Sequence, residues 1–357
     1  MKEICFIIGD INSSGGTERV TTLIANELCK KNYNIVILSL VNGNKPFFEL
    51  DSRVVIRNLY AQKVSFKKNY LKTILKVRQF VKSYKIETLV VVDSIHCVYT
   101  IPALIGSNIN HICWEHFNFN VDLGVPFRPL GRKLAARHCD SIVTLTKRDK
   151  ELWEKNLKNI KATITPILNP TPYVNIAHIP KLEFKTILAM GRLTYQKGFD
   201  LLISAWSEVY KNNTDWILRV VGSGEDEEEL KNQANLLGVS DSIDFVAVTN
   251  DVETYYQTSS FYCLSSRFEG LPMVLLEAQA YGLPIIAFNC DTGPSDVIEH
   301  GENGYLVENN NVKQLAFYID KAINQNDVQY QRMILESRNR SQKFELSNII
   351  KEWVKII

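Results

Sequence analysis

Two cations in the second half of the chain have the spacing and context of a diphosphate-binding loop. Arg192 and Lys197 belong to the segment G-R-L-T-Y-Q-K-G at 191–198, which follows an apolar run and precedes an amphipathic one. This order predicts a loop that joins a strand to a helix at the carboxyl edge of a sheet. A guanidinium fork and an ammonium can together hold a diphosphate and stabilise its charge as it departs. An exposed charged loop without a ligand would use the same residues.

Two glutamates further along the chain could bind hydroxyl groups. Glu269 and Glu277 form an E-x(7)-E pair within S-R-F-E-G-L-P-M-V-L-L-E at 266–277. Pro272 suits the first turn of a helix and Gly282 its end, so we expect Glu269 in a loop and Glu277 on the helix. A carboxylate accepts hydrogen bonds from two directions, which suits the donor hydroxyls of a neutral sugar. The alternative for Glu277 is a solvated helix position, although its immediate neighbours are apolar.

The first half of the chain offers three weaker candidates. Gly15 and Gly16, in G-G-T-E-R at 15–19, separate an apolar run from an amphipathic one. Paired glycines let a backbone approach a ligand, and a helix that follows them offers N–H groups to an anion, but a tight turn needs no ligand. His116, in W-E-H-F-N at 114–118, follows another apolar run and could be a site residue or a structural histidine.

The elements that must position these residues follow from the apolar pattern. Short runs rich in Val, Ile and Leu alternate with longer amphipathic stretches, which predicts parallel sheets covered by helices. The predicted strands cover residues 4–8, 35–40, 89–92, 111–114 and 141–145, and then 186–190, 216–221, 243–246, 261–264 and 284–288.

The proline-containing stretch at 167–172 separates the two sets of predicted strands. We therefore predict two doubly wound, Rossmann-like α/β domains, at 1–168 and 169–340, and a last helix in 341–357 that packs across them. Ligands of such sheets bind beyond the carboxyl ends of the strands, so two facing sheets imply a site in a cleft.

Composition excludes several classes of protein. The 41 Lys and Arg against 39 Asp and Glu give a net charge of +2, which does not suggest a nucleic-acid partner. The seven cysteines are scattered without a C-x-x-C pair, which favours buried thiols in a reducing compartment over disulfides or a zinc site. No stretch approaches the ~20 apolar residues of a spanning helix, and no signal peptide is recognisable. The sequence therefore predicts a cytoplasmic protein.

One stretch of the first half is strongly basic. Residues 63–85 carry eight Lys and Arg and no acid, with apolar residues at helical spacing. The ordinary interpretation is a helix whose apolar stripe packs on the sheet while its lysines are solvated. Our hypothesis is that the stretch from Lys63 to Lys85 meets anionic lipid head groups or the diphosphate of a lipid-linked acceptor.

Taken in order, these segments resemble the retaining glycosyltransferases of family 4, which have the GT-B fold. The resemblance covers most of the chain and also includes T-G-P-S-D-V-I at 292–298 and G-E-N-G-Y-L-V at 301–307. The G-G-T-E-R and W-E-H-F-N segments are similar to the branch that builds bacterial surface polysaccharides.

The resemblance implies a role for each candidate in the second half. Arg192 and Lys197 would bind the diphosphate of the donor, and Glu277 would accept hydrogen bonds from the ribose hydroxyls. Glu269 would hold hydroxyls of the donor sugar, helped by the backbone N–H groups of Gly270 and Leu271.

The resemblance also gives roles to the first half. The glycine loop, Gly15 and Gly16, would approach the phosphates, and His116 would lie near the transferred sugar. One departure concerns Ala247, because the family commonly has glycine at this position near the nucleobase, which leaves the base less certain.

The implied reaction is retaining, metal-independent transfer of a hexose or N-acetylhexosamine from a nucleotide sugar, with UDP as the expected nucleotide. No D-x-D motif occurs in the sequence, and we expect neither a metal nor another cofactor. The implied acceptor is a polyprenyl-diphosphate-linked glycan at the inner face of the cytoplasmic membrane.

Two alternatives remain. A nucleotide-sugar 2-epimerase shares this architecture, but the E-x(7)-E pair disfavours it. A non-catalytic glycan- or nucleotide-binding protein is disfavoured by the intact set Arg192, Lys197, Glu269 and Glu277. A dehydrogenase is disfavoured because G-S-G at 222–224 lacks a third glycine and precedes five acids.

Overall fold

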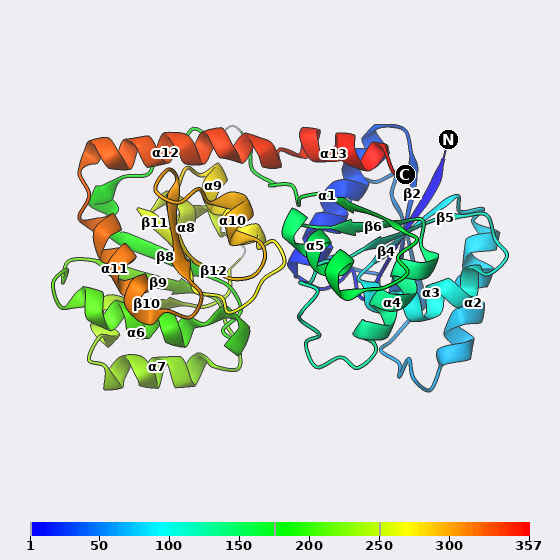
Figure 1. Ribbon diagram of the computed structural model, residues 1–357, viewed down its shortest axis with the longest axis horizontal. Coiled ribbons are helices and arrows are strands. Elements are labelled where there is room, and N and C mark those ends of the chain that lie inside the picture. The colour runs from blue at the N-terminus through cyan, green and yellow to red at the C-terminus, as the bar shows by residue number, and fades with distance from the viewer. Residues whose placement is uncertain (1, 175, 250) are drawn as a thin grey trace. The chain divides into compact units, whose positions relative to one another are not determined.

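Strands and helices alternate along the chain and form two separate parallel sheets (Figure 1). The computed structural model describes residues 2–174, 176–249 and 251–357. One compact unit comprises Met1–Pro170 and Leu346–Ile357, and the other comprises Thr171–Glu345. The chain therefore passes from one unit to the other after Pro170 and returns after Glu345.

The first unit contains a seven-stranded parallel sheet with the order β3-β2-β1-β4-β5-β6-β7. Its strands are β1 (Glu3–Ile8), β2 (Asn34–Val41), β3 (Val55–Tyr60), β4 (Thr88–Val92), β5 (Asn110–Trp114), β6 (Ser141–Thr144) and β7 (Thr163–Pro166). Its helices are α1 (Gly16–Lys30), α2 (Tyr70–Ser83), α3 (Cys97–Leu104), α4 (Arg128–His138), α5 (Lys147–Asn156) and α13 (Leu346–Val354). The strand order reverses direction between β1 and β4, as in a doubly wound sheet.

Alternate residues of the central strands serve the two faces of this sheet. Phe6 of β1 and Trp114 of β5 meet Trp353 of α13, with 4.6 Å between the ring centroids of the two tryptophans. Cys5 and Ile7 of β1 point to the other face of the sheet, where they belong to the core that α2, α3 and α4 cover. The final helix therefore buries its aromatic side chain in the first unit, whereas the sequence predicted one helix over 341–357 packing across both domains.

The second unit contains a six-stranded parallel sheet with the order β10-β9-β8-β11-β12-β13. Its strands are β8 (Thr186–Met190), β9 (Ile217–Val221), β10 (Ile243–Val246), β11 (Phe261–Leu264), β12 (Ile285–Asn289) and β13 (Gly304–Glu308). Its helices are α6 (Phe199–Tyr210), α7 (Glu227–Leu236), α8 (Glu253–Gln257), α9 (Met273–Ala280), α10 (Pro294–Val297), α11 (Val312–Ile323) and α12 (Asp327–Ser341). Figure 1 shows α6 and α7 on one side of this sheet and α9 and α10 on the other.

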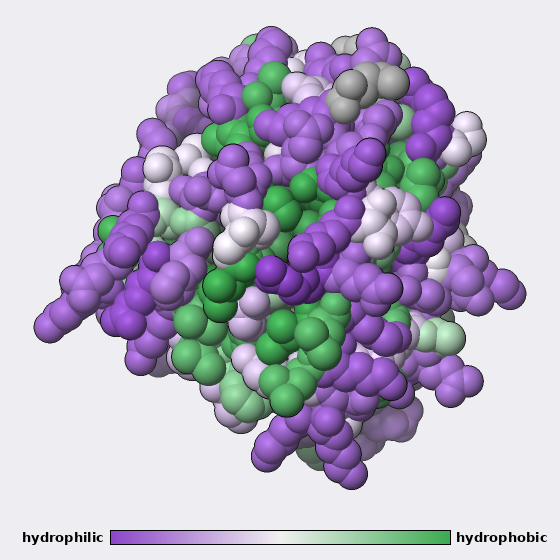
Figure 2. Space-filling model, turned by 90° about the vertical axis from the view of Figure 1, so that its right-hand side faces the viewer, coloured by the Kyte–Doolittle hydropathy of each residue, from purple (hydrophilic) through white to green (hydrophobic). Residues whose placement is uncertain are grey.

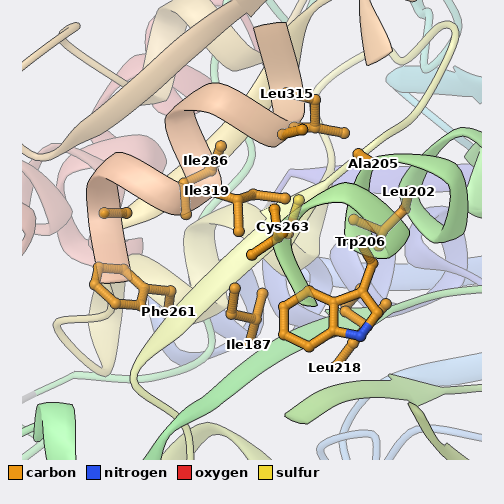
Figure 3. Packing of buried hydrophobic residues seen from close by; sticks show 14 of the residues in the cluster. Ile187, Leu202, Ala205, Trp206, Leu218, Phe261, Cys263, Ile286, Leu315 and Ile319 are labelled. Atoms are coloured by element: carbon orange, nitrogen blue, oxygen red, sulfur yellow. The ribbon is translucent and has the colours of Figure 1, made fainter. Parts of the chain in front are cut away.

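The core of the second unit lies between α6, α11 and the sheet (Figure 3). Trp206 of α6 is fully buried among aliphatic side chains, and its indole N–H donates to Ser242 Oγ at 2.9 Å. The remaining labelled side chains are Ile187, Leu202, Ala205, Leu218, Phe261, Cys263, Ile286, Leu315 and Ile319. Side chains of β8 and β11 are packed in this core, so the positions at which the loops after these strands begin are fixed.

All seven cysteines are buried and free. Among the described residues, no helix combines the length and the apolar character that crossing a bilayer requires.

Candidate functional site

The loops that follow β8 and β11 are fastened to each other at the carboxyl edge of the second sheet. Gly198 has a φ of +63°, and a Cβ there would lie 2.2 Å from the carbonyl oxygen of Ser265. Ser265 Oγ donates to the Lys197 carbonyl at 3.0 Å, and the Arg267 N–H donates to the Gln196 carbonyl at 2.8 Å. Glycine is therefore required at 198, and the contact places the predicted G-R-x(4)-K-G segment against the predicted glutamate loop.

Arg267 is a positioning residue that the sequence analysis did not single out. Its guanidinium donates to both carboxylate oxygens of Asp200, at 2.8 and 2.6 Å, and to the Tyr195 carbonyl at 2.7 Å. The same group lies over the Tyr195 ring, 4.1 Å from its centroid. These contacts hold the short turn Tyr195–Lys197 on the sheet edge. Arg267 is too far in the sequence from Tyr195 and Asp200 for these residues to form a recognisable motif.

Lys197 and Glu269 form a close ion pair. Lys197 Nζ lies 2.6 Å from Glu269 Oε1, and the carboxylate side chain is 7% exposed. The lysine stem runs along Gly191, where a Cβ would be 3.5 Å away. Thr292 Oγ1 donates to the Glu269 carbonyl at 2.5 Å, and this hydrogen bond holds the backbone of the loop that carries Glu269. The fold thus brings together one predicted cation and one predicted anion, 20% and 7% exposed, at a sheet edge.

Glu277 lies inside the protein, which rules out the solvated helix position that the sequence left open. Its residue is 2% exposed on α9, and Tyr256 donates its hydroxyl to Glu277 Oε2 at 2.8 Å. Burial, and then the charge of Glu277, raise the pKa of Tyr256 well above its usual value. The phenol therefore remains a donor to this carboxylate at neutral pH.

The loop between the two glutamates also carries the remaining predicted residues of this unit. Leu271 is buried, and Gly270 is partly exposed. Gly293, with a φ of +100°, packs so closely beneath them that a Cβ would meet the Gly270 carbonyl at 2.8 Å. The glycine of the T-G-P segment is thus needed for close packing under the loop.

A small pocket opens beside Arg192. Its volume is about 130 Å³, and it is lined by Met190, Gly191, Arg192, Val221, Gly222, Ser223, Val248, Thr249 and Val252. The Arg192 side chain is exposed and makes no ion pair with any residue in the described ranges. Apolar walls beside one cation suit a flat, partly apolar ring attached to an anion.

Gly222 and Gly224, which resemble part of a dinucleotide-binding motif, are needed for close packing of the backbone. A Cβ on Gly222 would lie 1.9 Å from the Gly191 carbonyl oxygen, and one on Gly224 would lie 2.1 Å from the Leu193 carbonyl oxygen. The loops after β8 and β9 therefore touch backbone to backbone. This observation explains why glycine occupies both positions without any pyrophosphate.

In the first unit, the predicted residues follow β1 and β5. Gly15 caps the start of α1, and Gly16, which is exposed, is the first residue of that helix. His116 is 9% exposed, and its Nε2 is buried without a hydrogen-bond partner among the described residues. Burial lowers the pKa of His116 to about 3, so the imidazole is neutral at ordinary pH. A buried ring nitrogen without a hydrogen-bond partner is uncommon in folded proteins.

The loop around His116 is held by Arg132, a second residue that the sequence analysis missed. Arg132 is 2% exposed and donates through Nε to Glu115 Oε2 at 3.1 Å and through Nη1 to Asp122 Oδ1 at 2.9 Å. The guanidinium also donates to the carbonyls of Asn118, Phe119 and Val121. Glu115 in turn accepts from the backbone N–H of His116 at 3.1 Å. One buried guanidinium therefore shapes the whole segment that carries His116.

Within the described ranges, one group of His, Cys and acidic side chains is close enough to hold a metal ion. It consists of Cys97, His111 and Cys139, and it contains none of the predicted site residues.

Two family models match successive parts of the chain. The model described as Glycosyltransferase Family 4 matches residues 14–171, and the model described as Glycosyl transferases group 1 matches residues 176–340. Together these matches cover most of both units.

Three curated proteins illustrate the similarity. An uncharacterized glycosyltransferase of Haemophilus influenzae is 44% identical over 357 residues, with full coverage of both chains. The amylovoran biosynthesis glycosyltransferase AmsD of Erwinia amylovora is 30% identical over 321 residues, covering 86% of each chain. A Campylobacter jejuni alpha-1,4-N-acetyl-D-galactosaminyltransferase is 27% identical, covers 100% of this chain and 98% of its own, and has a name that specifies an undecaprenol-PP-linked glycan.

Two solved structures illustrate the fold. Anabaena HepE, solved with UDP and glucose, superposes with a TM-score of 0.82 at 16% identity and covers 99% of each chain. A variant of S. aureus TarM, solved with UDP and alpha-GlcNAc-glycerol among its ligands, superposes with a TM-score of 0.81 at 14% identity. That match covers 100% of this chain and 99% of the other.

Proposed function

The chain belongs to the glycosyltransferases of family 4 and group 1, which have the GT-B fold, and from this membership we propose the reaction that it catalyses. It is a retaining glycosyltransferase of bacterial surface-polysaccharide biosynthesis. It moves a hexose or N-acetylhexosamine from a UDP-linked donor to a polyprenyl-diphosphate-linked glycan. The relatives from Erwinia and Campylobacter support this choice of pathway and acceptor.

The observation that carries the proposal is the Lys197–Glu269 pair beside the exposed Arg192. In the proposed complex the donor diphosphate lies between the two cations. The Lys197 ammonium then donates a hydrogen bond to the phosphate as well as to Glu269. The Glu269 carboxylate can therefore also accept hydrogen bonds from hydroxyls of the sugar. Glu269 holds Lys197 at the sheet edge, and a positive charge placed there in advance stabilises the departing diphosphate. In this proposal Arg192 and Lys197 supply the positive charge that stabilises the leaving diphosphate, so the reaction requires no divalent metal.

Glu277 and the pocket beside Arg192 account for the nucleoside part of the donor. We assign the buried Glu277 carboxylate, which accepts a hydrogen bond from the Tyr256 hydroxyl, to the ribose hydroxyls. The pocket of about 130 Å³ suits the edge of a base, with the described side chains Val248 and Val252 as apolar walls. Backbone N–H groups of Gly270 and Leu271 complete the donor contacts of this unit.

We assign the first-unit candidates to substrate groups. The unpartnered Nε2 of His116 would accept or donate a hydrogen bond with a sugar hydroxyl, which removes the cost of leaving this nitrogen unsatisfied. The start of α1 at Gly15 and the exposed Gly16 would face phosphate oxygens.

Turnover with a panel of nucleotide sugars tests the proposed function. The purified chain, incubated with a lipid-diphosphate-linked glycan, should release UDP from a UDP-hexose or UDP-N-acetylhexosamine, and EDTA should leave the rate unchanged. The product should keep the anomeric configuration of the donor. A changed nucleotide sugar without glycan product would identify the 2-epimerase instead, and nucleotide binding without turnover would identify the binding protein.

The membrane hypothesis rests on α2 and the segment before it. Six lysines of this stretch are exposed, namely Lys63, Lys67, Lys68, Lys72, Lys82 and Lys85. The other two cations are engaged, because Lys76 donates to the Leu59 carbonyl at 2.8 Å and Arg78 donates to the carbonyls of Ala103 and Ile105 at the end of α3. Fewer cations are therefore available than the sequence suggested.

Apolar side chains accompany the exposed lysines. Thr73, Val77 and Val81 form the buried face of α2, whereas Leu71 and Leu75 are 72% and 65% exposed. Leu71 is one of the apolar residues at helical spacing in this stretch, and it points to solvent. Figure 2 shows the side of the molecule that carries α2 in Figure 1, with hydrophobic groups gathered among hydrophilic ones. Exposed leucines one turn apart between lysines suit insertion at an anionic bilayer surface.

Co-sedimentation with vesicles tests this surface. Replacing Lys67, Lys68 and Lys72 by alanine should weaken binding to phosphatidylglycerol-containing vesicles strongly, at ~1 kcal/mol for each cation near the surface. The matched control removes the exposed lysines Lys147, Lys155 and Lys158 of the same unit and should bind like the unmodified chain. Equal binding by both triple variants, or equal binding to uncharged vesicles, would contradict the assignment.

A further inference from the structure

Three side chains able to bind a metal ion meet in the core of the first unit. Cys97 Sγ, a ring nitrogen of His111 and Cys139 Sγ all lie within 4.8 Å of one another, and all three residues are buried. Two thiols and one imidazole thus surround a common point.

Three different elements contribute to this group. His111 lies on β5. Cys97 begins α3, and Cys139 directly follows the last residue of α4. The group therefore lies where two helices meet the central part of the sheet, and both of its cysteines belong to the hydrophobic core cluster there.

The geometry around His111 is that of a metal ligand with a supporting partner. Cys139 Sγ lies 3.7 Å from His111 Nδ1, while Thr100 Oγ1 lies 3.2 Å from Nε2. A ligating histidine usually donates its other ring N–H to such a partner, which fixes the ring and its tautomer. Tetrahedral zinc with ordinary bond lengths would separate a thiolate sulfur from an imidazole nitrogen by about 3.6 Å. The observed separation already matches this value.

We propose that Cys97, His111 and Cys139 bind one soft metal ion, with zinc as the expected occupant. Thiolate and imidazole ligands favour zinc over magnesium or calcium, which prefer oxygen ligands. The three ligands are buried and come from three elements, so the ion would join α3 and α4 to β5 and take no part in sugar transfer. This inference departs from the sequence-based expectation, in which the absence of a C-x-x-C pair spoke against zinc. The proposed function does not depend on it.

Metal analysis of the full chain tests the proposal. Protein purified from cells grown with zinc should contain about one zinc per chain by mass spectrometry, as for other structural sites. Cys97→Ser and Cys139→Ser should each lose most of this zinc. Cys263→Ser is the matched control, because Cys263 is an equally buried thiol of the second unit, and it should keep the zinc.

Cobalt provides a readout that needs no variant. The unmodified chain, refolded with Co²⁺, should develop the intense thiolate-to-cobalt charge-transfer absorption of a tetrahedral thiolate site. If the unmodified chain lacks zinc, shows no such band and melts at the same temperature with and without added zinc, the three residues are ordinary core side chains. Equal zinc content in Cys97→Ser and Cys263→Ser would overturn the proposal as well.

Discussion

Replacing Lys197 by alanine is expected to reduce kcat/KM by about 100- to 1000-fold, the usual effect of removing one group that stabilises charge in the transition state. The proposed role of Lys197 is to receive the leaving diphosphate, and its ammonium is held 2.6 Å from Glu269 at the sheet edge. Steady-state release of UDP at several donor concentrations gives this ratio. The loss should appear in kcat, because the charge of the diphosphate increases as the glycosidic bond breaks.

Two further variants separate this role from a merely local effect. Lys211→Ala removes a lysine of the same unit from an exposed pair with Glu208 at 2.7 Å and should leave the rate unchanged. Lys197→Ala also leaves the buried Glu269 unpaired, so the double variant Lys197→Ala/Glu269→Gln removes both charges. Its rate should be no higher than that of Lys197→Ala, because Glu269 is itself assigned to the sugar, and its melting temperature should be restored. A double variant that recovers the rate would show that Lys197 only neutralises Glu269.

Replacing Arg132 by methionine is expected to destabilise the first unit by about 3–5 kcal/mol, the range for breaking a buried ion pair by removing one partner. The change removes the guanidinium that donates hydrogen bonds to Glu115, to Asp122 and to three backbone carbonyls. Urea unfolding followed by tryptophan fluorescence measures the loss. Because the His116 segment depends on the same guanidinium, activity should fall even at temperatures where the variant is folded.

The matched control for this variant is Arg137→Met on the same helix. Arg137 is exposed in the last turn of α4, where its interaction with the helix dipole is worth less than about 1 kcal/mol. If Arg137→Met and Arg132→Met lost similar stability, the buried network around Glu115 would not be what holds this segment.

The central strands could be predicted from the sequence, whereas three strands at the edges of the sheets could not. β3, β7 and β13 each lie at an end of a sheet and were not among the predicted strands. An edge strand is covered less completely than a central one, so its sequence need not be a continuous apolar run. β3 shows this, because two of its six residues are exposed.

The candidate site was predicted where its residues form short motifs and missed where partners are distant in the sequence. The loop positions of Lys197 and Glu269, and the helical position of Glu277, follow from local patterns. Their mutual contacts depend on the fold, and so do the roles of Arg267 and Arg132. The cysteine group illustrates the same limit, because its members are spread from residue 97 to 139 and only the packing of two helices on a strand brings them together.

The position of α13 has a consequence for biosynthesis. Trp353 fills the space beside Phe6 and Trp114, so the core of the first unit stays incomplete until residues 346–354 have left the ribosome. The second unit, which is continuous from Thr171 to Glu345, can finish folding earlier. The half of the enzyme that is translated first is therefore the half that matures last. A stop codon just before residue 346 should accordingly yield a protein whose amino-terminal half is the more protease-sensitive one.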